Sequence, residues 1–274
     1  TAQGIGQHHS RSRGAGMEFA QYRAYEPGDE PRQIDWKLYA RSDKFFVREA
    51  ERDSPLTAWV LLDASASMAQ TDAARPGWSR LSAGKAMAAC VFELACRQGD
   101  RFGLIAVNGS GLQVVNAGAG AKHRDACLWG LSQATAQGVW PSESVCRPIW
   151  ERIGANALAL MIGDGFDDQA LALAERLAAA RRELFHIRIL TAEERDFPFA
   201  GGQRFVDAET GAELLTDAPA SRDQYLQQFA LASRDLALRM AASGIRHVET
   251  FLDRPLDEPL RQLFGHSKRR GAEA

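Results

Sequence analysis

The stretch Thr57-Ala-Trp-Val-Leu-Leu-Asp63-Ala-Ser65-Ala-Ser67 decides the fold of this chain. Residues 57–62 form an apolar run that suits a strand buried on both faces, and the run stops at Asp63. Residues two apart in an extended chain project to the same side, so Asp63, Ser65 and Ser67 place one carboxylate and two hydroxyls above the strand end. Hard oxygen ligands of this kind suit Mg²⁺ or Mn²⁺. The stretch therefore predicts a buried strand followed by candidate metal ligands.

Strand and helix signals alternate along the middle of the chain. Apolar runs typical of strands occur at residues 102–107, 157–162, 184–190 and 245–251. Helical signals predict helices at about 80–97 and 167–182, a long one that starts at a capping box of Ser221 and Gln224, and a short one from about Asp257. A surface hairpin is expected at 205–215. This α/β order predicts a doubly wound, mostly parallel sheet with helices on both faces.

A second acidic residue follows another of these strands. Asp164 comes just after the strand expected at 157–162. The carboxyl ends of parallel strands are where open α/β sheets bind their ligands. Asp63, Ser65, Ser67 and Asp164 are therefore expected to hold a metal ion together. The alternative is structural: the first three residues would cap the next helix, and the second acid would serve a turn.

Composition excludes several classes of function. The 274 residues include 33 basic and 35 acidic side chains, a formal net charge of -2, so no broad basic face for nucleic acid is expected. Apolar runs stay well below the roughly 20 residues of a membrane helix, and we expect no membrane insertion by this chain. The four cysteines form no C-x-x-C pair. They predict reduced thiols and a cytoplasmic protein.

The N-terminal region differs in composition from the rest of the chain. Its first residues are polar and include several glycines, Pro27-Gly28 marks a turn, and residues 41–51 alternate in part between apolar and polar side chains, as in a strand. We expect a strand and loop segment that packs on the α/β body and buries Trp36, whose replacement by alanine would then cost about 3 to 5 kcal/mol. The expected parts are an N-terminal segment at 1–52, the α/β domain at 53–266 and a polar tail at 267–274.

The order of an apolar strand, D-x-S-x-S, a later apolar strand and D-G resembles the von Willebrand factor A fold with its metal-ion-dependent adhesion site. Four short motifs narrow the resemblance: Gly16-Met-Glu18-Phe19, Arg23-Ala-Tyr25-Glu-Pro27-Gly28-Asp29, Arg32-Gln-Ile34-Asp35-Trp36 and Ala40-Arg41. They look like the signature of domain-of-unknown-function family number 58, von Willebrand A-like proteins associated with MoxR-type AAA+ ATPases. The resemblance implies a non-enzymatic adaptor that works beside such an ATPase in assembling or activating client proteins.

The resemblance also implies roles for the candidate ligands. Ser65 and Ser67 would bind the metal directly, Asp63 and Asp164 would act directly or through water, and a partner's carboxylate would fill the open position. The resemblance likewise implies that the chain is not an enzyme.

One element departs from the resemblance. The third-loop threonine of the adhesion site should fall just after Gly138, where this chain has Val139 and Trp140. Ser142 is the nearest hydroxyl downstream and is the remaining candidate ligand. The departure implies a weak or partner-dependent metal.

Two other interpretations stay open. In the first, Gly163-Asp-Gly-Phe-Asp-Asp168 fits the G-D-x-x-x-D pattern of haloacid-dehalogenase-like phosphatases, and Asp63 would be the nucleophile. Those enzymes need an aspartate as general acid where this chain has Ser65, so no phosphatase turnover is expected. In the second, the chain is a scaffold whose metal site has decayed.

Overall fold

The structure is a computed structural model that describes residues 19–26, 34–50 and 56–265. The chain divides into two compact units between Leu56 and Thr57. The expected tail at 267–274 and two parts of the N-terminal signature, residues 16–18 and 27–33, lie outside the described residues.

A six-stranded sheet forms the centre of the larger unit. Its order is β12-β9-β8-β3-β6-β7, and only the pair β6–β7 is antiparallel. Counted along the chain this is the order 3-2-1-4-5-6 of a doubly wound fold, with the topological switch point between β3 and β8. The strands are β3 (Thr57–Asp63), β6 (Arg101–Asn108), β7 (Gly111–Gly118), β8 (Leu158–Gly163), β9 (Glu183–Leu190) and β12 (Arg246–Phe251).

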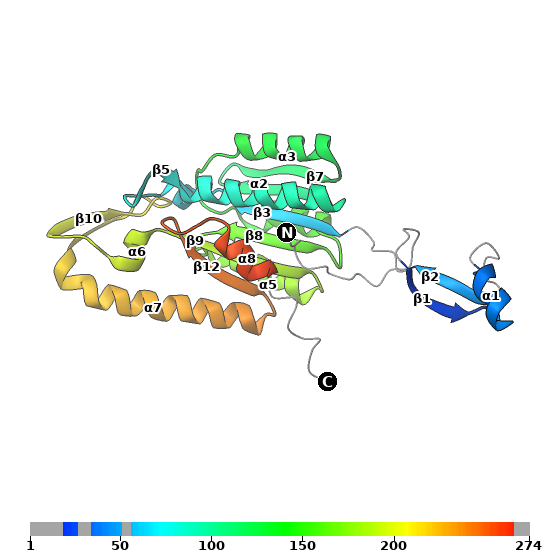
Figure 1. Ribbon diagram of the computed structural model, residues 1–274. Coiled ribbons are helices and arrows are strands. Elements are labelled where there is room, and N and C mark those ends of the chain that lie inside the picture. The colour runs from blue at the N-terminus through cyan, green and yellow to red at the C-terminus, as the bar shows by residue number, and fades with distance from the viewer. Residues whose placement is uncertain (1–18, 27–33, 51–55, 266–274) are drawn as a thin grey trace. The chain divides into compact units, whose positions relative to one another are not determined.

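Helices cover both faces of this sheet. Trp59 and Leu61 of β3 face a cluster formed with α4, α5 and α7, whereas Leu62 packs against Gly84 of α2 on the other face. Figure 1 shows α2 and α3 on one side of the sheet and α5 and α7 on the other. The helices are α2 (Arg80–Gln98), α3 (Ala121–Gln133), α4 (Glu143–Arg152), α5 (Asp168–Ala179), α7 (Ala218–Ala242) and α8 (Glu258–Phe264). The predicted α/β fold, a mostly parallel sheet with helices on both faces, is confirmed.

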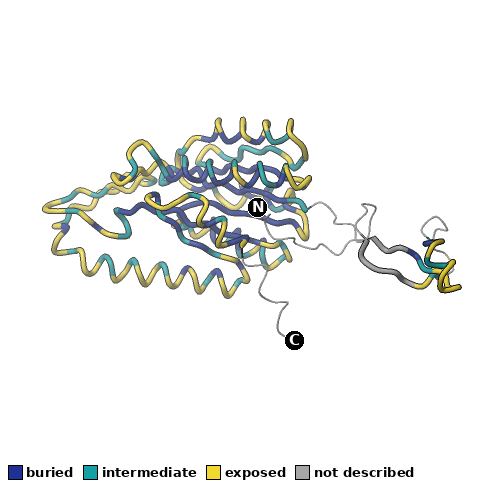
Figure 2. The backbone as a smooth tube through the Cα atoms, in the orientation of Figure 1, coloured by how far each residue is buried: buried dark blue, intermediate teal, exposed yellow. Residues whose placement is uncertain are grey.

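Burial follows from this layering. Every residue of β8 is buried, and so is all of β3 except its first residue. Figure 2 shows the buried backbone concentrated in the central strands and the exposed backbone in the outer helices and loops. Continuous apolar runs therefore did mark strands covered on both faces. Among the cysteines, Cys127 and Cys146 are buried, Cys96 is half-buried and Cys90 is exposed.

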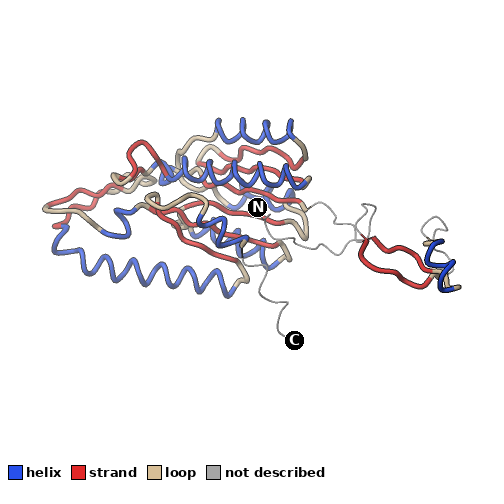
Figure 3. The backbone as a smooth tube through the Cα atoms, in the orientation of Figure 1, coloured by secondary structure: helices blue, strands red, loops and turns tan. Residues whose placement is uncertain are grey.

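Shorter elements surround the carboxyl edge of the sheet. The hairpin expected at 205–215 is present; its two strands come directly before α7 in the chain, as the tube in Figure 3 shows. The helix α7 begins at Ala218, with Pro219 in its first turn, where proline is well tolerated. Ser221 lies inside the helix and its hydroxyl donates to the Asp217 carbonyl at 3.0 Å, so the predicted capping box was wrong. The short elements are η2 (Ala66–Ala69), β4 (Thr71–Asp72), β5 (Arg75–Ser79), α6 (Ala192–Asp196), β10 (Gly202–Val206) and β11 (Glu213–Asp217).

The smaller unit contains a hairpin and a helix. Strands β1 (Phe19–Ala24) and β2 (Phe46–Ala50) pair antiparallel, and α1 (Trp36–Ser42) lies between them in sequence. The Asp35 carboxylate caps this helix by accepting the N–H groups of Lys37 and Leu38 at 2.9 and 3.0 Å. The helix was not predicted, because its seven residues are too few to show a clear period.

Trp36 is exposed, contrary to the prediction that its ring is buried. It is the first residue of α1 and is 58% exposed, with its ring centroid 6.1 Å from Tyr39 and 6.3 Å from Phe45. We now expect Trp36→Ala to lower the free energy of unfolding by about 1 kcal/mol or less, the scale of two edge-on aromatic contacts. Urea unfolding of the full chain measures this change. A loss of about 3 kcal/mol would show that the ring is covered after all.

Candidate functional site

The candidate site lies at the switch point of the sheet. Asp63 is the last residue of β3, and Asp164 directly follows β8, the neighbouring strand. Both side chains are buried, and they are close enough for the negative charge of Asp164 to raise the pKa of Asp63. The order of the strands thus brings together two carboxyls about a hundred residues apart in sequence, at the place where open α/β sheets bind ligands.

The serines follow Asp63 in a loop whose backbone is fixed. Asp63 Oδ1 accepts the N–H of Ser65 at 2.8 Å, and the hydroxyls of Ser65 and Ser67 lie 3.0 Å apart. The intervening alanines carry the backbone contacts: Ala64 N–H donates to Val107, and Ala66 N–H donates to Gly138, both at 2.7 Å. The alternation leaves the acidic and hydroxyl side chains together on one side of the loop.

The electrostatic state of Asp63 is unusual. Burial raises the pKa of its carboxyl to about 7, Asp164 adds to the rise, and the hydrogen bonds from Ser65 oppose it. A carboxyl with this pKa lacks a positive charge close enough to offset its desolvation. A divalent cation held by these oxygens would supply that charge.

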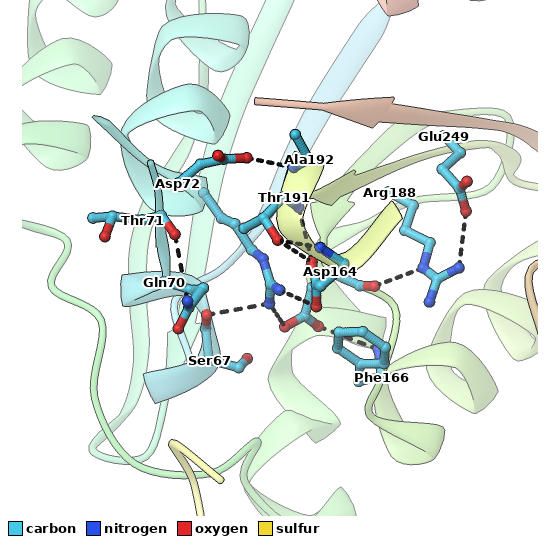
Figure 4. Close-up of polar contacts among 12 residues, drawn as sticks. Ser67, Gln70, Thr71, Asp72, Asp164, Phe166, Arg188, Thr191, Ala192 and Glu249 are labelled. Carbon is cyan, nitrogen blue, oxygen red and sulfur yellow. Dashed lines mark hydrogen bonds and ion pairs between the residues drawn. The ribbon is translucent and has the colours of Figure 1, made fainter. Parts of the chain in front are cut away.

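Arg80, which no sequence motif indicated, pairs with the carboxylate of Asp164. It is only 3% exposed; its guanidinium donates to Asp164 Oδ2 at 2.9 Å, to the Ser67 carbonyl at 3.3 Å, and to Glu194. Figure 4 shows Asp164 between Ser67 and Phe166 in this network. One sequence signal existed: an arginine in the first turn of a helix opposes the helix dipole, so it needs a reason to be there.

Arg188 holds the backbone behind the same carboxyl. Its Nε donates to the Asp164 carbonyl at 2.9 Å, and its Nη1 pairs with Glu249 at 2.9 Å, as Figure 4 shows. Arg188 therefore acts on the backbone of the strand end, whereas Arg80 acts on the carboxylate.

Gly163 is required by the position of Asp63. A Cβ atom at residue 163 would lie 2.9 Å from Asp63 Cβ and 3.1 Å from its Oδ2. We expect Gly163→Ala to lower the free energy of unfolding by about 1 to 2 kcal/mol, because the added methyl overpacks a buried strand. Gly154→Ala is the matched control, since nothing lies within 4 Å of its added Cβ. Equal unfolding midpoints for the two variants in urea would contradict the steric argument.

Ser142 is placed differently from the other candidates. It is exposed, precedes α4 as its N-cap residue, and its hydroxyl lies 3.0 Å from that of Ser144. Within the described residues, no hydrogen bond links its side chain to Asp63, Ser65, Ser67 or Asp164. Trp140 is buried in the core and Val139 is exposed. Neither side chain contains an oxygen, so neither replaces the hydroxyl of the expected threonine.

The hairpin β10–β11 brings a further carboxylate to the site. Glu209 lies in the turn of this hairpin, close enough to the hydroxyls of Ser67 and Ser65 for them to influence its pKa. Burial raises the pKa of Glu209; the two hydroxyls oppose this rise, and the charges of Asp164 and Asp167 add to it. No pattern in the sequence predicted this proximity, because a glutamate in a hairpin turn is ordinarily solvated.

The phosphatase pattern is used for structure in this chain. Asp167 caps α5 by accepting the N–H groups of Gln169 and Ala170 at 2.8 and 2.9 Å. Asp168, the last residue of the pattern, is exposed and pairs with Arg239 at 3.0 Å. Asp167 and Asp168 therefore form the beginning of helix α5. Among the described residues, no three His, Cys, Asp or Glu side chains form a metal cluster, so the candidate site depends on its hydroxyls.

Comparisons with known proteins agree with this architecture in part. The family model described as "Protein of unknown function DUF58" matches residues 21–235. Uncharacterized proteins of Mycobacterium tuberculosis and Mycobacterium bovis are 30% identical over 272 residues, which cover 95% of this chain and 82% of each relative. Within the described residues, no helix combines the length and apolar character needed to cross a membrane.

Solved structures resemble the chain only distantly. The conserved hypothetical protein BatB from Bacteroides thetaiotaomicron is 13% identical, with a TM-score of 0.47 over 77% of this chain and 96% of that one. The SpRpn10 VWA domain is also 13% identical, with a TM-score of 0.44 over 76% of this chain and 95% of that one. Similarity at this level does not bear on function.

Proposed function

Since this chain belongs to the family described as Protein of unknown function DUF58, we propose that it is a non-enzymatic, metal-dependent protein-binding adaptor. Its partner would be a MoxR-type AAA+ ATPase, with which it would assemble or activate client proteins. The observation that carries the proposal is the convergence of Asp63, Ser65, Ser67 and Asp164 at the switch point of the sheet. The identity of the ATPase rests on the resemblance of the N-terminal motifs alone, and the cytoplasmic location on the cysteine usage.

The donor set fits a hard divalent cation. Two hydroxyls lie 3.0 Å apart beside two buried carboxyls, and the raised pKa of Asp63 marks a deficit of positive charge. Ser65 and Ser67 would hold Mg²⁺ or Mn²⁺, with Asp63 and Asp164 nearby. The bound ion would supply an open, positively charged position for an acidic side chain of the partner. The backbone hydrogen bonds of Ala64 and Ala66 would hold the serine ligands at the edge of the sheet.

Titration calorimetry tests the metal. Mg²⁺ or Mn²⁺ is expected to give a binding heat with the wild-type chain that is lost in Asp63→Ala and in the double variant Ser65→Ala/Ser67→Ala, because both remove proposed ligands. Ser142→Ala should keep the heat, since the structure does not bring this hydroxyl to the other oxygens. Equal heats in the wild type and Asp63→Ala would remove the metal role.

Co-purification with the cognate ATPase tests the partner. Capture by the wild type and its loss in the double serine variant and in chelator support a metal-anchored complex. Capture that persists unchanged under both treatments would disprove the anchoring. No capture by the wild type would disprove the partner assignment.

A specific observation favours a second candidate function, a scaffold in which an arginine replaces the metal. Arg80 already neutralises Asp164 at 2.9 Å. In this alternative the edge of the sheet binds partners without an ion. The same titration separates the two, because the scaffold gives no heat in the wild type even when the ATPase is present.

A further inference from the structure

The smaller unit carries a group of aromatic side chains that contact one another at its surface. The Tyr39 and Phe45 rings are stacked, with their centroids 4.4 Å apart. Trp36 lies edge-on to both of them, at 6.1 and 6.3 Å, and Tyr25 lies 6.2 Å from Phe45. Trp36 is 58% exposed and Phe45 is 44% exposed. We call these four side chains the aromatic patch.

The aromatic patch is not the core of the smaller unit. None of the seven residues of α1 is buried, and Figure 2 shows this helix in the colours of half-buried and exposed residues. Among the side chains whose burial is described in this unit, Val47 is the only buried hydrophobic one. A helix ordinarily buries its apolar side, and exposed apolar side chains gathered in one place mark an interaction site.

Backbone hydrogen bonds hold the rings in position. The Tyr25 N–H donates to the Phe45 carbonyl at 3.0 Å, which joins the residue after β1 to the residue before β2. The Asp43 N–H donates to the Tyr39 carbonyl at 2.8 Å and closes the end of α1. Side chains on a backbone ordered in this way lose little conformational freedom when a partner binds, so more of their contact energy appears as affinity.

Basic side chains accompany the rings. Lys37, Arg41 and Lys44 are all exposed, and each lies within two positions of a ring of the aromatic patch. Lys37 and Arg41 are four positions apart on α1, so they lie on one side of the helix. Asp43 is the one exposed acid in α1 and the turn that follows it, and the other exposed acid, Glu26, follows β1. Positive charge is therefore concentrated on α1 and its turn.

We propose that the aromatic patch is a docking surface for a short acidic segment of a partner protein. Apolar side chains of the segment would pack on the rings, and its carboxylates would pair with Lys37, Arg41 and Lys44. The ring spacings of 4.4 to 6.3 Å fit a segment of a few residues. The aromatic patch belongs to a different compact unit from the candidate metal site, so this inference goes beyond the proposed function and does not rest on it.

The arrangement favours a protein segment over single-stranded nucleic acid. The Tyr39 and Phe45 rings stack with an interplanar angle of 10°, so each has one face already occupied. Nucleic-acid platforms instead offer open ring faces on which successive bases stack. The formal net charge of the chain, -2, also gives phosphates little general attraction.

Peptide selection against the full chain tests the docking surface. A library of random dodecapeptides displayed on phage is selected in chelator, which keeps the candidate metal site out of the experiment. The enriched peptides are expected to bind Trp36→Ala about tenfold more weakly than the wild type, the loss typical of a central aromatic contact. Trp129→Ala should bind them like the wild type. It is the matched control, because Trp129 of α3 is also exposed, at 69%, but lies in the larger unit. Failure to enrich any peptide, or equal affinities for Trp36→Ala and the wild type, would overturn the proposal.

Charge variants test the acidic character of the partner independently of the rings. The double variant Lys37→Gln/Arg41→Gln is expected to bind the enriched peptides several-fold more weakly, and the difference should shrink as salt screens these exposed charges. Arg97→Gln/Lys122→Gln removes two exposed cations from the larger unit and should leave the affinity unchanged. Enriched peptides that lack acidic residues, or an affinity unchanged in the first double variant, would overturn the acidic partner.

Two other probes test the remaining classes of partner. Fluorescent oligouridine and vesicles of phosphatidylglycerol are titrated with the wild type and with Trp36→Ala. Neither is expected to show binding that depends on Trp36. Binding of either probe that is tighter than that of the enriched peptides and is lost in Trp36→Ala would overturn the protein partner.

Discussion

Replacing Arg80 with methionine is expected to lower the free energy of unfolding by about 3 to 5 kcal/mol, the cost of leaving a buried carboxylate without its partner. Arg80 is almost fully buried, and its guanidinium pairs with Asp164 at 2.9 Å and also contacts Glu194. Methionine keeps much of the side-chain volume but removes the charge and the hydrogen bonds. Urea unfolding in the presence of chelator measures the loss.

The matched control is Arg97→Met in the same helix. Arg97 lies on the exposed surface of α2 and pairs only with Glu93, so its replacement should cost roughly 0.5 kcal/mol or less. A loss in Arg80→Met no larger than in this control would show that Asp164 finds another partner.

Added Mg²⁺ extends the same experiment. Without Arg80, the site holds two buried carboxyls and no resident cation, so Mg²⁺ should stabilise Arg80→Met more than it stabilises the wild type. Binding to the folded state alone raises stability with ligand concentration. An equal effect of Mg²⁺ on both proteins would mean that the arginine and the metal do not compete for Asp164.

Acidification from pH 7 to 4.5 is expected to destabilise the Asp63→Asn variant by about 5 kcal/mol, about half from each of two buried histidines, and the wild type by about 2 kcal/mol. The destabilising group is a buried histidine pair. His186 on β9 and His247 on β12 are neighbours in parallel register, and their Nδ1 atoms lie 3.1 Å apart. Burial lowers the pKa of His186 to about 3, with further lowering by His247 and Arg188. Burial likewise lowers the pKa of His247 to about 4.

The sign follows from where the protons bind. A histidine whose pKa falls from 6.5 in the unfolded chain to about 3 in the fold contributes stability that is fully present above pH 6.5. That stability is lost as the pH falls toward 3, at about 1.4 kcal/mol per pH unit for one proton. Unfolding therefore becomes easier in acid.

Asp63 acts in the opposite direction in the wild type. Its pKa rises from 3.8 to about 7 on folding, so its contribution is fully present below pH 3.8 and is lost as the pH rises through 7. Between pH 7 and 4.5 the gain from Asp63 offsets roughly the loss from one of the two histidines, and the loss from the other remains. The asparagine variant removes this offset and exposes the histidine contribution.

Urea unfolding of both proteins in chelator, at pH 7 and 4.5, makes the measurement. His186→Phe in the Asp63→Asn background should remove about half of this pH dependence, since the neutral ring fills the space without taking a proton while His247 still titrates. Parallel profiles for the wild type and Asp63→Asn would contradict the opposing roles of the two groups.

Local sequence determined five of the six strands of the central sheet and the spacing of the candidate ligands; the edge strand β7 was not predicted. The apolar runs before Asp63 and Asp164 predicted β3 and β8. A strand that is buried on both faces carries apolar side chains along its whole length, so the first polar residue marks its end. Asp63, Ser65 and Ser67 do come together as predicted. The period of two of an extended backbone covers only Asp63 and Ser65, because Ser67 lies in the 3-10 helix η2. The predicted hairpin at 205–215 likewise follows from turn residues between two short strands.

Local sequence failed where a short helix reversed the expected exposure. Asp35 binds the N–H groups of the next turn, and this places Trp36 at an exposed helix start. Ser142 was predicted as a ligand from its distance to Gly138 along the chain, and it lies at the exposed N-cap position of α4. Both residues lie at helix termini, whose positions local sequence patterns predict poorly.

Only the tertiary structure decided which groups share the space around Asp63. Arg80 reaches Asp164 across 84 positions of the sequence. Glu209, in the turn of the β10–β11 hairpin, comes close enough to Ser65 and Ser67 for their hydroxyls to influence its pKa, and Gly163 must lack a side chain because β8 lies beside β3. These contacts join separate elements through the packing of the sheet, the helix and the hairpin. No period or motif encodes them, because the pairing of distant charges depends on the distances that the whole fold creates.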